Sequence, residues 1–250
     1  MIIAVAMQKG GTGKTTTAAI LAQAAARHKL KVLAVDLDPQ RNLTSALGVD
    51  AEEPTGNAYK LLTGERAADQ VYPSRQEYID IVPASKDLST IPGGPGSARR
   101  LQDALRAISA VYDIVIIDTP PTAGVLQYNA LQAAHKLIIP LNADGYSAEG
   151  LYTIEENARQ IQKSNPALKI AGILYTQYSQ NSDYNRQLFR AIINTACVKM
   201  NIPFLGTTRS TDRVKEAAGL QISLYEHAPK CSAAADYMDV FNEITNYQYT

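Results

Sequence analysis

Two lysines flank a glycine-rich turn near the start of the chain, in the stretch "AMQKGGTGKTTT". The glycines Gly10, Gly11 and Gly13 allow the backbone to wrap closely around a phosphate, with its N–H groups pointing inward. A helix that starts directly after the turn would add the positive end of its dipole. Lys14 would neutralise the β- and γ-phosphates of a nucleotide, and the Thr15 hydroxyl would bind Mg²⁺. The stretch therefore predicts a site for ATP and Mg²⁺.

The turn departs from the strict P-loop pattern, because Gln8 stands where that pattern requires glycine. The second half of the pattern, Gly13-Lys14-Thr15, is intact. Lys9 is left over, since Lys14 already occupies the place of the P-loop lysine, and Lys9 could point away from its own phosphates. The alternatives are a plain glycine-rich turn with surface lysines, or a functional loop in which Lys9 is only a solvated side chain.

Three aspartates follow short apolar runs, where ligands bind in open α/β sheets. Asp36 and Asp38 are two residues apart, so in an extended segment both carboxylates could face the same Mg²⁺ or water. Asp118 ends the run "IVIID" about 100 residues after the glycine turn. An apolar run that ends in Asp is a weak signal alone, because many α/β strands end in this way. It becomes more informative because it follows the glycine turn, with Asp36 and Asp38 between them. The alternative for Asp36 and Asp38 is a turn cap before Pro39.

Continuous apolar runs alternate with helix-like stretches along most of the chain. Runs that do not alternate between apolar and polar residues suit parallel strands buried on both faces. We therefore expect an α/β fold, a doubly wound, mostly parallel sheet flanked by helices, forming a single domain over residues 1–250. In the glycine- and proline-rich turn 91–100, Ser97 is a possible helix N-cap. The predicted strands lie at 2–7, 32–35, 78–82, 114–117, 136–141, 170–175 and 202–205, and the first helix at 15–28.

The composition excludes several classes of protein. The 24 basic and 24 acidic residues cancel, so net charge argues neither for nor against nucleic acid. The two cysteines form no C-x-x-C pair, which favours reduced thiols in the cytosol over a metal or iron–sulfur site. No apolar run approaches the roughly 18 residues of a membrane span, and the apolar N-terminus is too short for a signal sequence. We expect a cytoplasmic protein that does not bind membrane.

The stretch "KGGTGKTT" resembles the deviant Walker A motif of the ParA/MinD family of P-loop NTPases. "DLDPQRNLT" is similar to the switch I of that family, usually D-x-D-P-Q-G-N, and "DTPP" is similar to its switch II. The resemblance covers most of the chain, strongly over residues 1–45 and 110–155. It implies an ATPase that forms a homodimer with ATP sandwiched at the interface. The residues that it implies for the nucleotide are Lys9, Gly10, Gly11, Thr12, Gly13, Lys14, Thr15 and Thr16.

By the same resemblance, each charged residue of the site receives a role. Lys9 would cross the dimer interface and contact the nucleotide of the other subunit. Asp38 would orient or accept a proton from the attacking water, so the expected catalytic residues are Lys9, Lys14 and Asp38. The expected metal site consists of Thr15, Asp36 through its water shell, and Asp118 at the Walker B position.

The sequence also departs from the family. Arg41 stands where switch I usually has glycine. The segments 207–209 ("TTR") and 175–178 ("YTQY") differ from the usual forms, and in relatives these segments border the adenine. The identity of the base is therefore less firmly predicted than the phosphates.

Partition ATPases of this family bind DNA of any sequence in the ATP state, and basic residues in relatives contact it. The corresponding segment here carries acidic residues, Asp212 and Glu216, between its basic ones. A solvated helix face is therefore the alternative. The resemblance further implies a ParB-like activator protein and a bacterial, nucleoid-associated location. The predicted DNA-binding residues are Arg209, Arg213, Lys215 and Lys230.

Other outputs of such a switch receive less support from the sequence. A MinD-like regulator should end in a basic amphipathic helix, whereas the tail "DYMDVFNEITNYQYT" has no Lys or Arg. A nitrogenase-type reductase would need paired cysteines, and Cys197 and Cys231 are badly placed. A P-loop tyrosine kinase would carry a tyrosine-rich tail, at which Tyr247 and Tyr249 hint. Positioning of a protein cargo stays open, and the sequence does not name the cargo.

Overall fold

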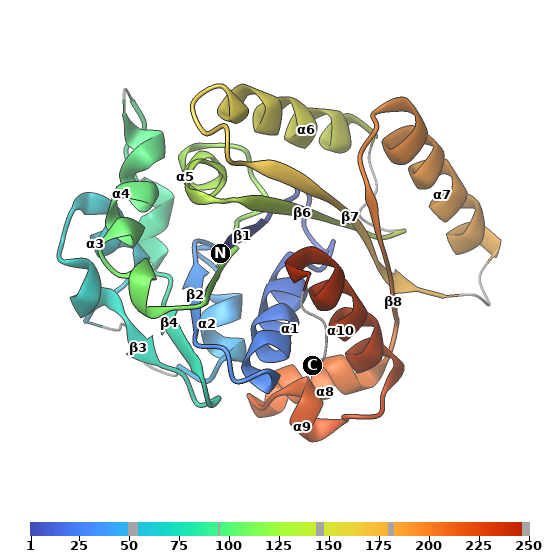
Figure 1. Ribbon diagram of the computed structural model, residues 1–250, viewed down its shortest axis with the longest axis horizontal. Coiled ribbons are helices and arrows are strands. Elements are labelled where there is room, and N and C mark those ends of the chain that lie inside the picture. The colour runs from blue at the N-terminus through green and yellow to red at the C-terminus, as the bar shows by residue number, and fades with distance from the viewer. Residues whose placement is uncertain (50–54, 95, 144–147, 180–182, 247–250) are drawn as a thin grey trace.

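One eight-stranded sheet forms the centre of the molecule in the computed structural model, which describes residues 1–49, 55–94, 96–143, 148–179 and 183–246 (Figure 1). The strand order is β3-β4-β2-β5-β1-β6-β7-β8. Every pair of neighbours is parallel except β3 and β4, which are antiparallel. The strands are β1 (Ile2–Val5), β2 (Val32–Asp36), β3 (Tyr72–Pro73), β4 (Ile79–Val82), β5 (Ile114–Asp118), β6 (Lys136–Leu141), β7 (Lys169–Tyr178) and β8 (Phe204–Arg209).

Helices cover both faces of the sheet (Figure 1). One face carries α3 (Ala58–Thr63), α4 (Arg100–Arg106), α5 (Val125–Ala133), α6 (Ala148–Gln162) and α7 (Asp183–Ile193). The other carries α1 (Lys14–Arg27), α2 (Asn42–Ala46), α8 (Asp212–Leu220), α9 (Leu224–His227) and α10 (Ser232–Thr245). Short 3-10 helices are η1 (Ala67–Gln70), η2 (Lys86–Thr90), η3 (Ser97–Arg99) and η4 (Ser109–Val111), and a π-helix, η5 (Asn194–Lys199), continues α7. The predicted fold class is confirmed.

Side chains of the central strands alternate between two hydrophobic cores. On β1, Ile3 and Val5 pack on the α1 side, whereas Ala4, and Ala6 directly after the strand, face the α5 side. All four are fully buried. A strand points successive side chains to opposite faces, so a strand covered on both faces must be apolar at every position. This is the physical reason for the unbroken apolar runs in the sequence.

The sequence predictions differ from the structure at several strand ends and in two other places. The predicted strand at 2–7 ends two residues beyond β1, and β7 extends three residues past the predicted strand at 170–175. The last strand is β8, so the predicted strand at 202–205 begins two residues too early and ends four too early. The two-residue strand β3 was not predicted. Ser97 is not a helix N-cap, because Gly96 precedes the 3-10 helix and Ser97 is its first residue. The Ser97 carbonyl instead accepts a hydrogen bond from Asn129 Nδ2 at 2.7 Å.

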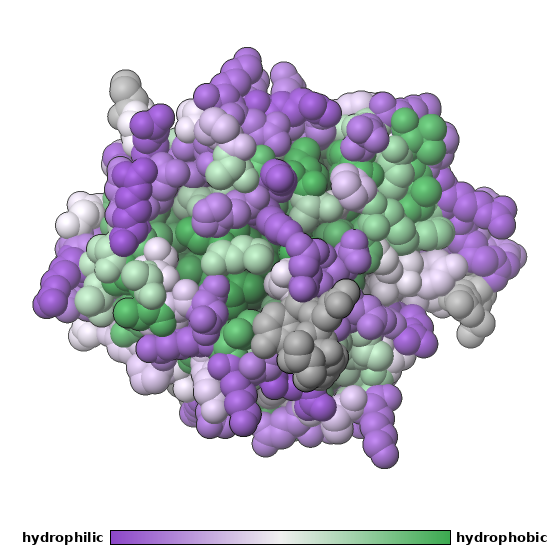
Figure 2. Space-filling model, viewed as in Figure 1, coloured by the Kyte–Doolittle hydropathy of each residue, from purple (hydrophilic) through white to green (hydrophobic). Residues whose placement is uncertain are grey.

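The surface carries mostly polar side chains on the face shown in Figure 2, with apolar side chains gathered over α7. No helix among the described residues is long and apolar enough to cross a membrane. Tyr247 and Tyr249, the two tyrosines of the predicted tail, lie outside the described residues.

Helix α10 closes the α1 side of the core. Its Phe241 is fully buried, and the ring stacks on His28 at the end of α1 with 5.5 Å between the ring centroids. Thr17 at the start of α1 lies 3.3 Å, oxygen to oxygen, from the Tyr237 hydroxyl of α10. The C-terminal helix therefore holds α1 over most of its length, and α1 begins at the glycine turn.

We expect Phe241→Ala to lower the free energy of unfolding by about 3–5 kcal/mol, because it leaves a cavity between α1 and α10. Urea denaturation followed by circular dichroism measures this change. Leu220→Ala is the control, since Leu220 is 59% exposed, and its effect should stay within about 0.5 kcal/mol. Equal losses in the two variants would show that α10 is not part of the core.

Candidate functional site

The glycine turn links the end of β1 to the start of α1, at the edge of the sheet where the parallel strands end. Gly11 and Gly13 have positive φ angles of 75° and 85°. Gly13 is the N-cap of α1, so the first free N–H groups of a 14-residue helix open into the turn. This is the geometry of a phosphate-binding loop.

Three hydrogen bonds hold the carbonyl groups of this loop. Lys14 Nζ donates to the Lys9 carbonyl at 2.7 Å, and Asn142 Nδ2 donates to the Gly11 carbonyl at 2.8 Å. Thr176 Oγ1 donates to the Thr12 carbonyl at 2.9 Å. The donors come from α1 and from residues at the ends of β6 and β7, so the sheet itself fixes the loop.

Lys14 is buried, with 6% of its surface exposed. Burial lowers the pKa of its ammonium, and the nearby carboxylates of Asp118 and then Asp38 oppose that shift. An ammonium without full solvation gains more from a bound anion than a surface lysine does. Lys14 is therefore placed to meet a phosphate.

Asp118 and Thr15 form a site that fits Mg²⁺. Thr15 Oγ1 donates to Asp118 Oδ2 at 2.6 Å, and Asp118 Oδ1 is buried with no hydrogen-bond partner in the described part of the chain. Burial, and next the charge of Asp36, raises the pKa of Asp118 well above its usual value. A cation at Oδ1 would remove the cost of this unpaired atom and favour the charged carboxylate.

Within the described residues, no group of three or more His, Cys, Asp or Glu side chains could hold a metal ion. Mg²⁺ usually keeps several waters and takes one or two carboxylates together with substrate phosphates. A single carboxylate beside a hydroxyl therefore suits an ion that arrives with a nucleotide.

Asp36 uses both carboxylate oxygens inside the protein. Its Oδ2 accepts hydrogen bonds from Thr44 N at 2.8 Å and Thr44 Oγ1 at 2.7 Å, and its Oδ1 accepts one from Asp38 N at 3.0 Å. Burial raises the pKa of Asp36 to about 6 although the Thr44 bonds lower it. Asp36 and Asp118 are register partners on neighbouring strands. The metal role predicted for Asp36 stays a prediction, and the structure shows it anchoring the following loop.

Arg41 has left-handed backbone angles, with φ 61° and ψ 27°, at the N-cap of α2. Such angles cost an L-residue about 1–2 kcal/mol and glycine almost nothing. A glycine, the usual residue in the switch I that this segment resembles, would adopt these angles at almost no cost.

A cavity of about 370 Å³ collects most of the residues predicted for nucleotide binding and catalysis. Asp38 also lines it, and its Oδ1 accepts a hydrogen bond from Gln40 N at 2.9 Å. The structure thus brings the glycine turn, Lys14, Thr15 and Asp38 together around one space. The cavity is lined by Gly10, Gly11, Gly13, Lys14, Thr15, Thr16, Asp38, Gln40, Asn42, Pro121 and Gln177.

Lys9 does not line this cavity. Its residue is exposed, and its ammonium has no hydrogen bond or ion pair with any described residue. Only its carbonyl takes part in the loop, as the acceptor for Lys14. The side chain is therefore available to another molecule.

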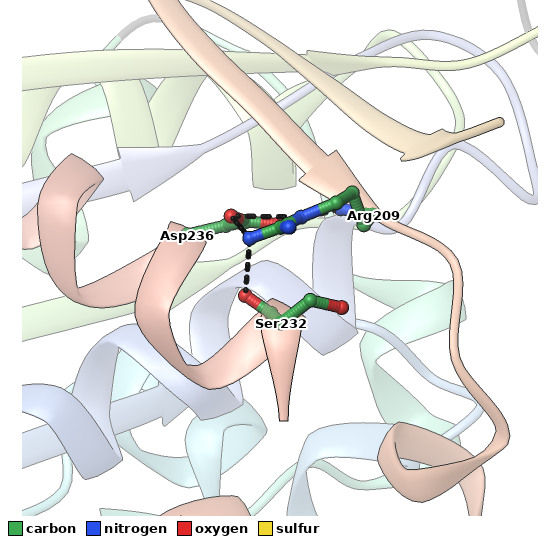
Figure 3. A network of polar contacts seen from close by, with 3 residues as sticks. All are labelled: Arg209, Ser232 and Asp236. Atoms are coloured by element: carbon green, nitrogen blue, oxygen red, sulfur yellow. Dashed lines mark hydrogen bonds and ion pairs between the residues drawn. The ribbon is translucent and has the colours of Figure 1, made fainter. Parts of the chain in front are cut away.

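Two of the predicted DNA-binding residues already have acidic partners. Arg209 Nη2 lies 2.6 Å from Asp236 Oδ1, and its Nε lies 3.0 Å from Asp236 Oδ2 (Figure 3). Arg209 Nη2 also donates to the Ser232 carbonyl at 3.5 Å. These contacts join the end of β8 to α10. Arg213 pairs with Glu216 at 2.7 Å.

Lys215 and Lys230 lie in different surroundings. Lys230 is exposed beyond α9. Lys215 lines a second cavity, of about 380 Å³, which Thr15 and Thr16 at the start of α1 also line. The four basic residues therefore do not share one environment.

Sequence reasoning did not single out four polar residues of the site: Asn42, Asn142, Thr176 and Gln177. Gln177 and Thr176 lie in the segment "YTQY", and Asn142 follows the apolar run of β6. A polar residue directly after a buried strand was the available signal.

The family model described as an AAA domain matches residues 1–170. The chromosome partitioning protein ParA of Myxococcus xanthus is 38% identical over 197 residues, which are 76% of this chain and 70% of that protein. The chromosome-partitioning ATPase Soj of Thermus thermophilus is 36% identical over 248 residues, which are 97% of this chain and 94% of Soj. The chain belongs to the ParA/MinD family of P-loop ATPases.

A solved structure of the same fold contains a nucleotide. The crystal structure of cobyrinic acid a,c-diamide synthase from Mycobacterium smegmatis, with a bound ATP analog and magnesium, is similar to this chain with a TM-score of 0.82 and 29% identity. The match covers 95% of this chain and 91% of that chain. The recognition of the ParA/MinD family from the deviant Walker A motif is confirmed.

We expect Gly13→Ala to lower the free energy of unfolding of this family member by about 1–2 kcal/mol, because of the positive φ angle. A Cβ at Gly13 would also lie 3.3 Å from Thr176 Oγ1. Gly10→Ala is the matched control, since its Cβ would meet no atom within 4 Å. Urea denaturation of both variants without nucleotide measures the difference, and a loss of the same size for Gly10→Ala would contradict the interpretation.

Proposed function

We propose that this chain is an ATP-hydrolysing switch for DNA partition, which dimerises when it binds Mg·ATP. The observation that carries the proposal is the glycine turn, held by hydrogen bonds to its carbonyls, with buried Lys14 and Asp38 lining one cavity beside it. Membership of the ParA/MinD family, with ParA and Soj relatives that align over most of the chain, supports the partition role.

In the proposed reaction, the N–H groups of the glycine turn and Lys14 hold the phosphates of ATP. Thr15 Oγ1 and Asp118 Oδ1 would hold Mg²⁺, which neutralises negative charge on the phosphate oxygens when it is bound. Asp38 lines the same cavity as Lys14, so its carboxylate can orient a water molecule for attack on the terminal phosphate. Positioning and electrostatic stabilisation are the main contributions to phosphoryl transfer.

The exposed ammonium of Lys9 supports the dimeric state of the proposal. Lys14 already serves the phosphates of its own subunit, while the Lys9 side chain has no partner among the described residues. In a two-fold dimer, each Lys9 would meet the nucleotide of the other subunit, so the contact would form twice. Part of the free energy of ATP binding would then appear as free energy of association.

We expect Lys14→Ala to abolish ATP binding, because it removes the charge from the phosphate loop. Lys9→Ala should instead keep ATP binding by the monomer and lose ATP-dependent dimerisation. Its stimulated rate of hydrolysis should fall by a factor of about 10³ or more. Titration with a fluorescent ATP analogue measures binding, and analytical ultracentrifugation with a non-hydrolysable analogue measures dimerisation. A Lys9→Ala protein that dimerises like the wild type would refute the contact between subunits.

The basic residues after β8 support non-specific DNA binding in part. Surface ion pairs contribute about 0–1 kcal/mol, so a DNA phosphate can replace Glu216 as the partner of Arg213. Arg209 is held more firmly, because Asp236 accepts hydrogen bonds from both its side chain and its backbone N–H. Lys230 is exposed and forms no ion pair with any described residue, so it can meet a phosphate. The proposal also includes a ParB-like activator protein and a single domain over residues 1–250.

We expect binding to duplex DNA of any sequence when ATP is present, with weaker binding as salt rises. Lys230→Ala should weaken this binding and lower the slope of log K against log salt by about one. Lys163→Ala is the control, because Lys163 is an exposed lysine after α6. Fluorescence anisotropy at several salt concentrations measures both, and absence of binding at low salt with ATP would refute the DNA role.

A further inference from the structure

Helix α5 carries three buried amide side chains, and they differ in their hydrogen bonds. Asn129 is fully paired, since its Nδ2 donates to the Ser97 and Val125 carbonyls and its Oδ1 accepts from Leu101 N. Gln132 has a partner for both its nitrogen and its oxygen, since Nε2 donates to the Ser164 carbonyl and Oε1 accepts from the Ser164 hydroxyl. Gln127 is fully buried, and its Nε2 has no partner among the residues described.

The carbonyl oxygen of Gln127 links three parts of the chain. It accepts a hydrogen bond from Gln8 Nε2 at 3.2 Å and another from Asn157 Nδ2 of α6 at 3.5 Å. Gln8 stands directly before Lys9 at the start of the phosphate loop. Gln127 is the third residue of α5, which begins after the "DTPP" segment. One side chain thus joins the phosphate loop to the helix that follows switch II.

An unpaired buried N–H group costs about 1–3 kcal/mol, which opposes the stabilisation from the two hydrogen bonds that the Gln127 carbonyl accepts. Neighbouring side chains on the same helix are apolar and buried, among them Leu126, Ala130 and Leu131. A glutamine at this position therefore contributes little to stability. Its bond to Gln8 is what an apolar residue could not supply.

From this geometry we infer that Gln127 is a positioning residue, which fixes the base of the phosphate loop, and with it Lys9, relative to the switch II helix. The inference rests on the proposed ATPase function for its kinetic consequence. A shift of α5 would move Gln8 through this hydrogen bond, so a conformational change in switch II would change the position of Lys9. Loss of the bond should leave ATP in place and impair the alignment needed for hydrolysis.

The test compares Gln127→Met with Gln132→Met, which remove amides of similar burial from the same helix. For Gln127→Met we expect a thermal unfolding midpoint within about 2 °C of the wild type. The substitution removes the unpaired Nε2 group, which is stabilising, and the hydrogen bonds from Gln8 and Asn157, which is destabilising, so the two effects oppose each other. Its kcat for Mg·ATP should fall about tenfold with KM within about twofold, since displaced catalytic groups lower the rate more than binding. Gln132→Met should show the reverse, a lower midpoint and normal kinetics, because it removes both hydrogen bonds to Ser164 and no unpaired group is lost in exchange.

Amide hydrogen exchange of residues 8–13 gives a readout that does not depend on ATPase activity. We expect faster exchange in Gln127→Met than in the wild type or Gln132→Met, because the loop loses its contact with α5. Unchanged exchange in Gln127→Met, or equal kinetic losses in the two variants, would overturn the inference. A wild-type protein that does not hydrolyse ATP but shows this exchange pattern would refute the proposed function and keep Gln127 as the residue that positions the loop.

Discussion

The direction of the carbonyl groups in the glycine turn is the constraint on which the site depends. A peptide group points its N–H opposite to its C=O, so amides can face an anion only if the carbonyls are held elsewhere. Here Lys14, Asn142 and Thr176 hold the carbonyls of Lys9, Gly11 and Thr12. Two of the three donors come from the ends of β6 and β7, and therefore the order of strands in the sheet determines the shape of the loop.

The two hydrophobic cores hold the elements that carry the site in fixed positions relative to one another. Helix α1 starts at the loop and is held by α10, whose Phe241 packs on His28 near the far end of α1. The carboxylates of Asp36 and Asp118 end two neighbouring strands and are brought together by the register of β2 and β5. Rigid elements buried on both faces thus present the polar groups at one edge, where a nucleotide can meet them.

Much of this could be predicted from the sequence, because the signals were local. Unbroken apolar runs identified the strands, and Gly13-Lys14-Thr15 identified the loop and the start of α1. The hydrogen bonds from Asn142 and Thr176 could not be predicted, since each joins residues more than 100 positions apart. The Arg209–Asp236 ion pair could not be predicted either, because a row of basic residues does not reveal which of them pairs with an acidic residue in the fold. The edge strand β3 was missed because two residues carry no periodicity.

Switch I is anchored at both ends by one carboxylate. Asp36 holds Thr44, and the Thr44 hydroxyl in turn accepts a hydrogen bond from Ala84 N at 3.0 Å, beyond the end of β4. The seven residues between the anchors, 37–43, therefore form an arc of fixed span, whatever side chains they carry. Arg41 adopts its left-handed backbone angles inside this arc, at the N-cap of α2. Because Asp36 and Thr44 set the span, a change of side chain within the arc can alter what the loop contacts without moving the points at which it begins and ends.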